Sequence, residues 1–357
     1  MTNMELGASI GAGFIVVVFV YNKWQEHKAR KSVARAFSSD HDDVLMRSDG
    51  REPSFDIGGG NGGNGGDGGG MVEPIMGAST LPGTDPSTPA AELATSLVDP
   101  LIDCLIPLSL ETPVRGDKIL PVLQTLRHVG NKPVHFIGLH VNGDWEPIAH
   151  GGVYTKLQAG VQMASRTTAL NELEYSELVT RLRVLADEIG AEPEIPDMIE
   201  VMGEARTLHR FVSGHDAQLG VNLLSNGAPW SIATLIGALE KQGFDVRPDG
   251  RYIMPDGDGG QLFTLSTNVT LGADTTSRLT LLLDVPCVAP QREGFGQMVA
   301  CAKALVGRLD AIIVDDSDQP LMDEALGEIN NQVLEFYQEM EAADIPAGST
   351  RAMRLFS

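Results

Sequence analysis

Histidine and cysteine are the side chains that most often catalyse reactions or bind metals, and this chain has eight histidines and three cysteines. Four histidines fall on a predicted helix, strand and turn, with neither HExxH spacing nor a neighbouring cysteine pair: His128, His135, His140 and His150. Cys104, Cys287 and Cys301 have no CxxC spacing, and their odd number disfavours a disulfide framework. We therefore expect reduced core cysteines and no zinc site.

Asp315, Asp316 and Asp318 form the most acidic short cluster of the folded part. They follow the apolar strand-like segment 311–314 and precede the last long helical pattern. Carboxylates near the start of a helix can accept hydrogen bonds from its free N–H groups. We interpret this cluster as a helix cap and turn in preference to a metal site.

Asp256 and Asp258 alternate as in a calcium loop, but the twelfth position counted from Asp256 is Thr267 instead of glutamate. The chain also contains no GxSxG, SxxK or nucleotide-binding fingerprint. We therefore predict a protein that is not an enzyme, with no catalytic residue, no cofactor and no metal. A hydrolase would need several of the scattered carboxylates and histidines to converge in one cleft.

Strand and helix patterns begin near Val98 and occur twice in the same order: β, α, β, β, α and a further helix. The paired elements are strands 104–110 and 219–225, helices 117–129 and 231–242, strands 155–163 and 278–286, helices 175–189 and 295–309, and helices starting at 198 and 322. Gly130 and Gly243 follow the first helix of each copy, where a left-handed C-cap is expected. We predict the α+β class, with tandem α/β domains at 98–216 and 217–345, each with helices on one face of a mainly antiparallel sheet. A tail is expected at 346–357.

The second copy also contains a predicted β-hairpin, in which 251–254 and 261–269 flank the turn PDGDGG. Alternation in its strands assigns one apolar phase to the helix-covered face: Leu219, Val221, Leu223, Phe263, Leu265, Val269, Leu279, Leu281, Leu283 and Val285. The opposite phase is Gly220, Asn222, Leu224, Thr264, Ser266, Asn268, Thr280, Leu282 and Asp284. This second face is left available to solvent or to a partner.

The chain has a formal charge of −22, which disfavours a nucleic-acid partner. Residues 38–97 are rich in Gly, Pro and Ser and include GGGNGGNGGDGGG at 58–70, so we expect a disordered linker. A phosphate-binding loop would need a preceding strand, a GK[ST] ending and a following helix, and the sequence has none of these around the glycine run.

Residues 1–37 contain the segment Leu6 to Tyr21, which carries no charge and would span roughly 24 Å as a helix. Tyr21, Lys23 and Trp24 follow at the expected membrane interface, and the cations beyond them favour a cytoplasmic location for the rest of the chain. We predict a single transmembrane helix with a periplasmic N-terminus. A buried core helix and a cleaved signal peptide are alternatives, although no cation precedes the apolar stretch. Gly7 and Gly11 have a spacing that would permit a homodimer.

Several segments together resemble the ZipA-type bacterial cell-division proteins. They are the apolar segment running into YNKWQE, the low-complexity linker, and then LFTLSTNV, LTLLLDVP, FGQMVACAKALVGRLDAIIVDDSDQPL and NQVLEFYQEM in that order. The resemblance covers about the first 35 and about the last 130 residues. It implies a cytoplasmic domain whose open sheet face binds the C-terminal peptide of the tubulin-like protein FtsZ, tethering FtsZ filaments to the inner membrane at the division site.

The positions of this sequence that the resemblance assigns to the peptide site are Asn222, Arg251, Thr264, Ser266, Asn268, Thr270, Thr280 and Leu282. Of the strand positions that align with the family's groove, only Leu282 is apolar, so a hydrophobic peptide is expected to bind more weakly here. The alternative function is a membrane-anchored envelope scaffold that binds a different division protein. The first copy would be either a structural platform, which its polar open phase favours, or a site for another division protein.

Overall fold

The computed structural model describes residues 90–247, 251–269 and 273–357, which belong to one compact unit. The predicted membrane helix, its interface residues Tyr21, Lys23 and Trp24, most of the predicted linker and Thr270 therefore lie outside the described residues. Among the helices that are described, none combines the length and the apolar character needed to span a bilayer.

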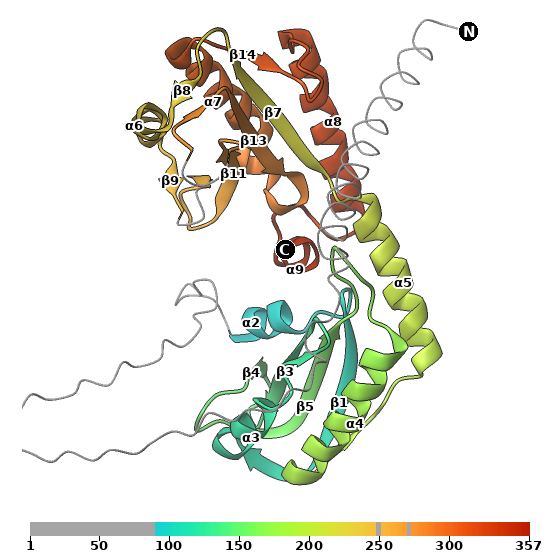
Figure 1. Cartoon of the computed structure of the whole chain (residues 1–357). Coiled ribbons are helices and arrows are strands. Elements are labelled where there is room, and N and C mark those ends of the chain that lie inside the picture. The colour runs from blue at the N-terminus through green and yellow to red at the C-terminus, as the bar shows by residue number, and fades with distance from the viewer. Residues whose placement is uncertain (1–89, 248–250, 270–272) are drawn as a thin grey trace, which may run out of the picture. The chain divides into compact units, whose positions relative to one another are not determined.

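A six-stranded antiparallel sheet, which we call the first sheet, is built by the N-terminal half of the described residues. Its strand order is β2-β3-β5-β1-β6, with β4 paired to β3. The elements are α2 (Ala90–Leu97), β1 (Asp103–Arg115), α3 (Gly116–Leu123), β2 (His128–Val129), β3 (Lys132–His140), β4 (Trp145–Pro147), β5 (Val153–Gln162), α4 (Glu172–Ile189), β6 (Ala191–Pro193) and α5 (Met198–Gly214). In Figure 1, α4 lies on one side of this sheet and α2 on the other.

The C-terminal half builds the second sheet, also antiparallel, with the order β14-β7-β13-β11-β10-β9. Its strands are β7 (Gln218–Ser225), β9 (Asp245–Val246), β10 (Tyr252–Pro255), β11 (Gln261–Ser266), β13 (Arg278–Asp284) and β14 (Ala311–Val314). A small ladder pairs β8 (Trp230–Ser231) with β12 (Thr275–Thr276). The helices are α6 (Ile232–Gln242), α7 (Gly294–Leu309), α8 (Asp323–Ala342) and α9 (Thr350–Phe356), with short 3₁₀ turns η1 (Val285–Cys287) and η2 (Pro290–Arg292).

The two sheets share a strand order. The order β6-β1-β5-β3 in the first sheet parallels the order β14-β7-β13-β11 in the second. Strands β1, β5, β7, β11, β13 and β14 lie where strands were predicted, whereas β3 and β6 were not predicted. The α+β class and the antiparallel sheets are thereby confirmed. The hairpin of β10 and β11 is also confirmed, with Tyr252 opposite Leu265 and Ile253 opposite Thr264.

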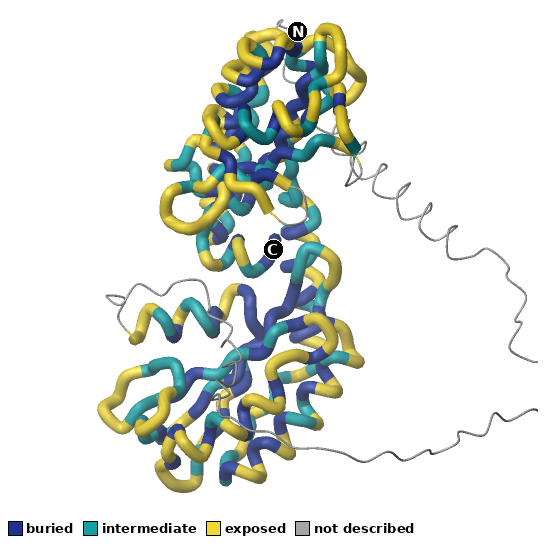
Figure 2. Tube along the Cα trace, turned by 60° about the vertical axis from the view of Figure 1, so that its left-hand side comes forward, coloured by how far each residue is buried: buried dark blue, intermediate teal, exposed yellow. Residues whose placement is uncertain are grey.

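The core follows the predicted alternation. Val221, Leu223, Phe263, Leu265, Leu279, Leu281, Leu283 and Val285 are each at most 2% exposed, and α7 packs against the strands that carry them. Figure 2 shows buried residues concentrated along the strands and the inner sides of the helices. Leu219, near the start of β7, is only partly buried. Val269 is 39% exposed, because β11 ends at Ser266 and Asn268 adopts a left-handed backbone with φ 55°.

One of the two predicted helix C-caps is correct. Gly243 ends α6 with φ 98° and ψ 15°, and its N–H donates to the carbonyls of Leu239 and Glu240. Gly130 also has positive φ, 54°, but it lies in the turn between β2 and β3. The predicted helix 117–129 was too long: α3 ends at Leu123, and the pairing of His128 and Val129 with β3 takes up the rest of the segment.

Gly243→Ala should lower the free energy of unfolding by about 1 kcal/mol, because a side chain disfavours the left-handed conformation that this cap requires. Urea unfolding measures the change. Gly237→Ala is the matched control: it lies inside α6, and nothing lies within 4 Å of an added Cβ. That control should be neutral or stabilising by up to about 1 kcal/mol. Equal effects of the two substitutions would contradict the prediction.

Both ends of the described region form helices where the sequence led us to expect linker and tail. Helix α2 begins at Ala90, inside the predicted linker, and α9 occupies most of the predicted tail. Ala352, Leu355 and Phe356 of α9 are completely buried. Helix α9 contacts η1 of the second half, and Arg354 of α9 pairs with Asp103 of β1. The last residues therefore connect the two halves of the compact unit.

Candidate functional site

The face of the second sheet that points away from α7 is the candidate site, and we call it the open face. Strand register places Ile253, Thr264, Leu282 and Gly220 in one row across β10, β11, β13 and β7. Leu282 is 38% exposed, and Gly220 is also exposed. The nearest atoms to a Cβ added at Gly220 lie 4.0 Å away. This row therefore combines two apolar side chains with open space above the glycine.

A second row on the open face is a chain of polar hydrogen bonds. The Ser266 hydroxyl donates to Asn268 Oδ1 at 3.3 Å, and Asn268 Nδ2 donates to Thr280 Oγ1 at 2.7 Å. The Thr280 hydroxyl in turn donates to Asn222 Oδ1 at 2.6 Å, and Asn222 Nδ2 donates to Asp316 Oδ1 at 2.9 Å. Because each donor fixes the orientation of the next group, this row is a rigid polar strip that ends on a carboxylate.

The acidic cluster after β14 completes this strip instead of capping α8. Asp315 Oδ1 accepts the N–H groups of Ser317 and Gln319, each at 2.8 Å, and so closes a turn. Asp318 pairs with Arg278 at 2.6 Å. Helix α8 has Met322 at its N-cap position with no side-chain hydrogen bond. The turn interpretation is therefore confirmed and the helix-cap interpretation is wrong.

The structure brings most of the predicted peptide-site residues onto this one face. Thr264, Ser266, Asn268, Thr280 and Leu282 lie on β11, on β13 or just beyond β11. Asn222 is only 2% exposed. Arg251 is exposed and directly precedes β10, where its carbonyl accepts the N–H of Arg247. A partner would therefore meet Leu282, Thr280 and Asn268 before it could reach Asn222.

Sequence reasoning missed the apolar residues that flank the polar row. Ile253 neighbours Thr264 on one side, and Ile312 of β14 pairs with Leu224 on the other side. Leu224 was assigned to this face, but Ile253 and Ile312 were not. A signal for Ile253 was present in the predicted hairpin. If Tyr252 lies opposite Leu265 on the buried face, then Ile253 must lie opposite Thr264 on the open face. The open face is thus less polar than its aligned positions suggested.

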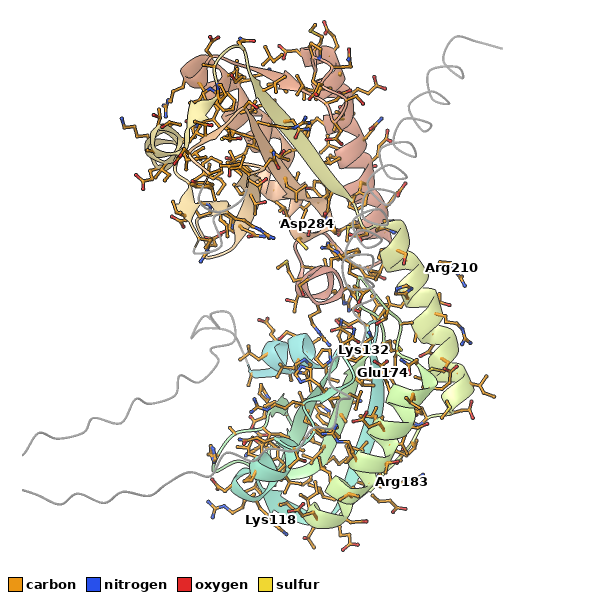
Figure 3. The ribbon with its side chains drawn as sticks, in the orientation of Figure 1. Lys118, Lys132, Glu174, Arg183, Arg210 and Asp284 are labelled. Carbon is orange, nitrogen blue, oxygen red and sulfur yellow. The ribbon has the colours of Figure 1, made fainter. Side chains whose placement is uncertain are left out.

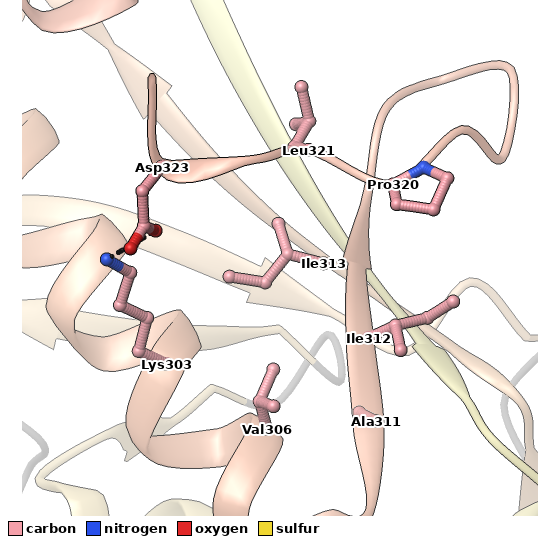
Figure 4. Close-up of a pocket in the computed structure, with 8 residues that line it drawn as sticks. All are labelled: Lys303, Val306, Ala311, Ile312, Ile313, Pro320, Leu321 and Asp323. Carbon is pink, nitrogen blue, oxygen red and sulfur yellow. Dashed lines mark ion pairs between the residues drawn. The ribbon is translucent and has the colours of Figure 1, made fainter. Parts of the chain in front are cut away.

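A shallow pocket of about 300 Å³ lies between α7 and the edge strand β14, beside Val306, Ile313 and Leu321. Figure 4 shows the ion pair between Lys303 and Asp323 at its rim, with an Nζ–Oδ1 distance of 2.8 Å. Both partners are well exposed, so the pair contributes little to stability. None of the predicted peptide-site residues lines this pocket.

In the described part of the chain, the cysteine thiols are not activated and no metal-binding group of side chains is found. Burial raises the pKa of the Cys104 and Cys287 thiols to about 12 and that of Cys301 to about 11. The three cysteines are free thiols, and they are protonated at neutral pH. Across residues 90–247, 251–269 and 273–357, no three His, Cys, Asp or Glu side chains gather in a way that could hold a metal.

The second sheet is backed by helices on one face, and its other face presents fixed polar groups beside exposed apolar ones, where a partner could dock. Residues 218–332 match the family described as ZipA, C-terminal FtsZ-binding domain. The match covers the second sheet, α6, α7 and the first half of α8, and it confirms the resemblance to ZipA-type proteins for this half. That family is defined by binding FtsZ, not by catalysis. The search of curated proteins found no match to the chain.

Proposed function

We propose that this chain tethers FtsZ filaments to the cytoplasmic face of the inner membrane at the division site, and that the open face binds the C-terminal peptide of FtsZ. The observation that carries the proposal is the family match to an FtsZ-binding domain over the residues that build the open-faced sheet. The uncharged segment 6–21, its flanking cations and the glycine-rich segment 58–70 support the tethering half of the proposal.

The two rows of the open face would make different contacts with the peptide, one apolar and one through hydrogen bonds. Leu282 and Ile253 offer apolar contact area, while the exposed amide of Asn268 has a second N–H group beyond the one that it donates to Thr280. Apolar anchors supply most of the free energy in such interfaces. We therefore expect Leu282 to contribute more to peptide affinity than any residue of the polar strip.

Leu282→Asp should weaken binding of a peptide copying the FtsZ C-terminus at least about tenfold, because a charge would replace an exposed apolar anchor. Fluorescence anisotropy of the labelled peptide with the full chain in detergent measures the Kd. Leu334→Asp is the matched control, since Leu334 is 49% exposed on α8, which belongs to the helical side of the domain. Equal Kd values for both variants would place the peptide elsewhere, and no binding by the unaltered chain would refute the proposed partner.

A membrane-anchored scaffold for a different division protein is the second candidate, and one observation favours it. Ser266, Asn268 and Thr280 give the open face a polar row, which suits a partner that is less dependent on apolar anchors. Imaging a fluorescent fusion while FtsZ is depleted discriminates the two functions. Bands at midcell that persist without FtsZ would support the scaffold, and bands that disperse would support the FtsZ tether.

In either function, we propose that the first half serves as a platform for the second. Arg166 pairs with Asp216 at 2.9 Å and with Asp284 at 2.8 Å, and Asp284, labelled in Figure 3, is the last residue of β13. Gln162 of β5 donates to the carbonyl of Arg354 at 2.9 Å. These contacts come from the end of the second sheet at β13 and from α9, so they leave Leu282 and Thr280 accessible to a peptide.

A further inference from the structure

The first sheet also has a face that points away from its main helix α4, and the chain covers that face with its own helix α2. Ala94, Leu97 and Val98 pack against Ile137, Leu105 and Trp145 in a small apolar cluster separate from the main core. Ile137 alternates with Val134 and Phe136, which belong to the main core instead. Helix α2 therefore occupies the face of the first sheet that corresponds to the open face of the second.

The register of the two sheets shows how closely these faces correspond. In the first sheet, β1 and β5 pair Leu105 with Gly160. In the second sheet, β7 and β13 pair Gly220 with Leu282. Because β1 and β5 stand in the strand order where β7 and β13 stand, each face presents a leucine opposite a glycine on this central strand pair, although the glycine lies on β5 in the first sheet and on β7 in the second.

The glycine of each pair marks where an apolar side chain can sit. A Cβ added at Gly160 would lie 2.8 Å from Cγ1 of Val98, so Val98 already fills the space above that glycine. Gly220 lies on the neighbouring strand position of the second sheet, and there the atoms nearest to an added Cβ are 4.0 Å away. The first face is thus seen with an occupant, and the second face is seen without one.

Helix α2 is held by this apolar cluster and, at its last residue, by a hydrogen bond that Arg354 Nη1 donates to the carbonyl of Leu97 at 3.2 Å. Of its eight described residues, only Ala94 is fully buried. Directly after it the chain is held firmly, because the Asp99 N–H donates to Asp103 Oδ2 at 2.8 Å and Asp99 Oδ2 accepts from Arg351 at 2.6 Å. If the Leu97 hydrogen bond breaks, α2 and Val98 can therefore leave the sheet together, while Asp99 keeps the strands that follow in place.

We propose that the covered face of the first sheet is a second docking surface for the FtsZ C-terminal peptide, occupied in cis by α2, and that the peptide competes with α2 for it. This inference rests on the proposed function of the second sheet. Its consequence is that the chain offers one peptide site while α2 is docked and two when α2 is released. Two linked sites would raise the avidity for a filament, in which the peptide is repeated.

Peptide stoichiometry on the full chain in detergent tests this. Ala94→Asp places a charge in the apolar cluster and should release α2, so that calorimetric titration with the FtsZ C-terminal peptide gives two sites in place of one. Thr95→Asp, on the exposed side of the same helix, is the matched control and should leave one site. Combining Ala94→Asp with Leu282→Asp should leave one high-affinity site, now on the first sheet.

A free peptide copying residues 86–98 provides a readout that does not use FtsZ. It should bind the Ala94→Asp chain and not the unaltered chain, whose face is already filled. Hydrogen exchange of the β1 and β5 amides verifies that Ala94→Asp still folds. Should that variant unfold, Ala90→Gly with Ala91→Gly weakens α2 at two exposed positions and should also expose the second site.

The outcomes separate this inference from the proposed function. One FtsZ peptide on the unaltered chain and still one on the α2-released chain would overturn the inference and leave the proposed function standing. Failure of the 86–98 peptide to bind the released chain would overturn it as well, since α2 would then not be a ligand of that face. No FtsZ peptide on any form of the chain would refute both proposals.

Discussion

Arg354→Ala is expected to lower the free energy of unfolding by about 3–5 kcal/mol at pH 7, because it leaves a buried carboxylate without its cation. Asp103 has no exposed side-chain surface, and Arg354 is 14% exposed. Arg354 Nη2 donates to Asp103 Oδ1 at 2.5 Å and Nη1 donates to Oδ2 at 2.9 Å, so the pair is bidentate. The pair joins α9 to β1 across 251 residues of sequence.

The pH dependence of this effect follows from the direction of one pKa. Burial raises the pKa of Asp103 above 3.8, although Arg354 opposes the shift. Without Arg354 the pKa of Asp103 in the folded chain must rise further, so the folded chain holds a proton that the unfolded chain releases above pH 3.8. The destabilisation should therefore be small near pH 4 and reach its full size at neutral pH. Urea unfolding at pH 4.5 and pH 7 measures both values.

Two further variants make this prediction specific. Lys303→Ala breaks the exposed pair with Asp323 and should cost no more than about 1 kcal/mol. Asp103→Asn combined with Arg354→Ala buries no charge and should recover part of the stability that Arg354→Ala loses. If Arg354→Ala lowered the free energy of unfolding no more than Lys303→Ala, the ion pair between α9 and β1 would not hold the two halves together.

The strands of the second sheet could be predicted because each carries its own signal. Leu279, Leu281 and Leu283 alternate with Arg278, Thr280 and Leu282, and burial follows the same alternation. Similarly, Gly243 directly follows a helical pattern that ends where a left-handed residue is needed. Local patterns of this kind depend on neighbours within a few residues, which a sequence shows directly.

The parts that could not be predicted depend on partners far away in sequence. Helix α9 contains a short polar stretch with two arginines, and it becomes helix because its buried side chains and Arg354 meet the rest of the unit. Helix α3 was predicted too long because the pairing of His128 and Val129 with β3 overrides the helical pattern. Propensity is a weak prior when tertiary contacts compete with it.

The sequence predicted which residues share the open face of the second sheet, but not the hydrogen bonds that link them. Alternation placed Thr280 and Leu282 on the open side of the sheet, where the structure has them. It could not show that Asn222 is buried beneath a turn whose Asp316 lies 94 residues further along the chain. For the same reason, the acidic cluster was assigned from the sequence to the start of α8, which follows it along the chain. In the structure, Asp316 accepts a hydrogen bond from Asn222 and Asp318 pairs with Arg278, both on the second sheet.

Acid should destabilise the fold through His135, and His135→Gln should remove that part of the loss. Burial, together with the nearby cations Arg354 and His128, lowers the pKa of His135 to about 4 from its usual 6.5. As the pH falls below 6.5, His135 becomes protonated in the unfolded chain, whereas in the folded chain it stays neutral until about pH 4. Stability is therefore lost over this interval, by up to about 3 kcal/mol for a shift of this size.

Chemical unfolding at pH 7 and pH 4.5 of the unaltered chain and of His135→Gln gives the loss for each, and the other titrating groups cancel in the difference. We expect the variant to lose less stability than the unaltered chain by about 2–3 kcal/mol over this interval. His150→Gln is the control, since the His150 side chain is 79% exposed, and it should change the loss little. Because His135 lies in the row of Gly160, on the face that α2 covers, an equal loss in all three chains would mean that water reaches this face in the folded protein.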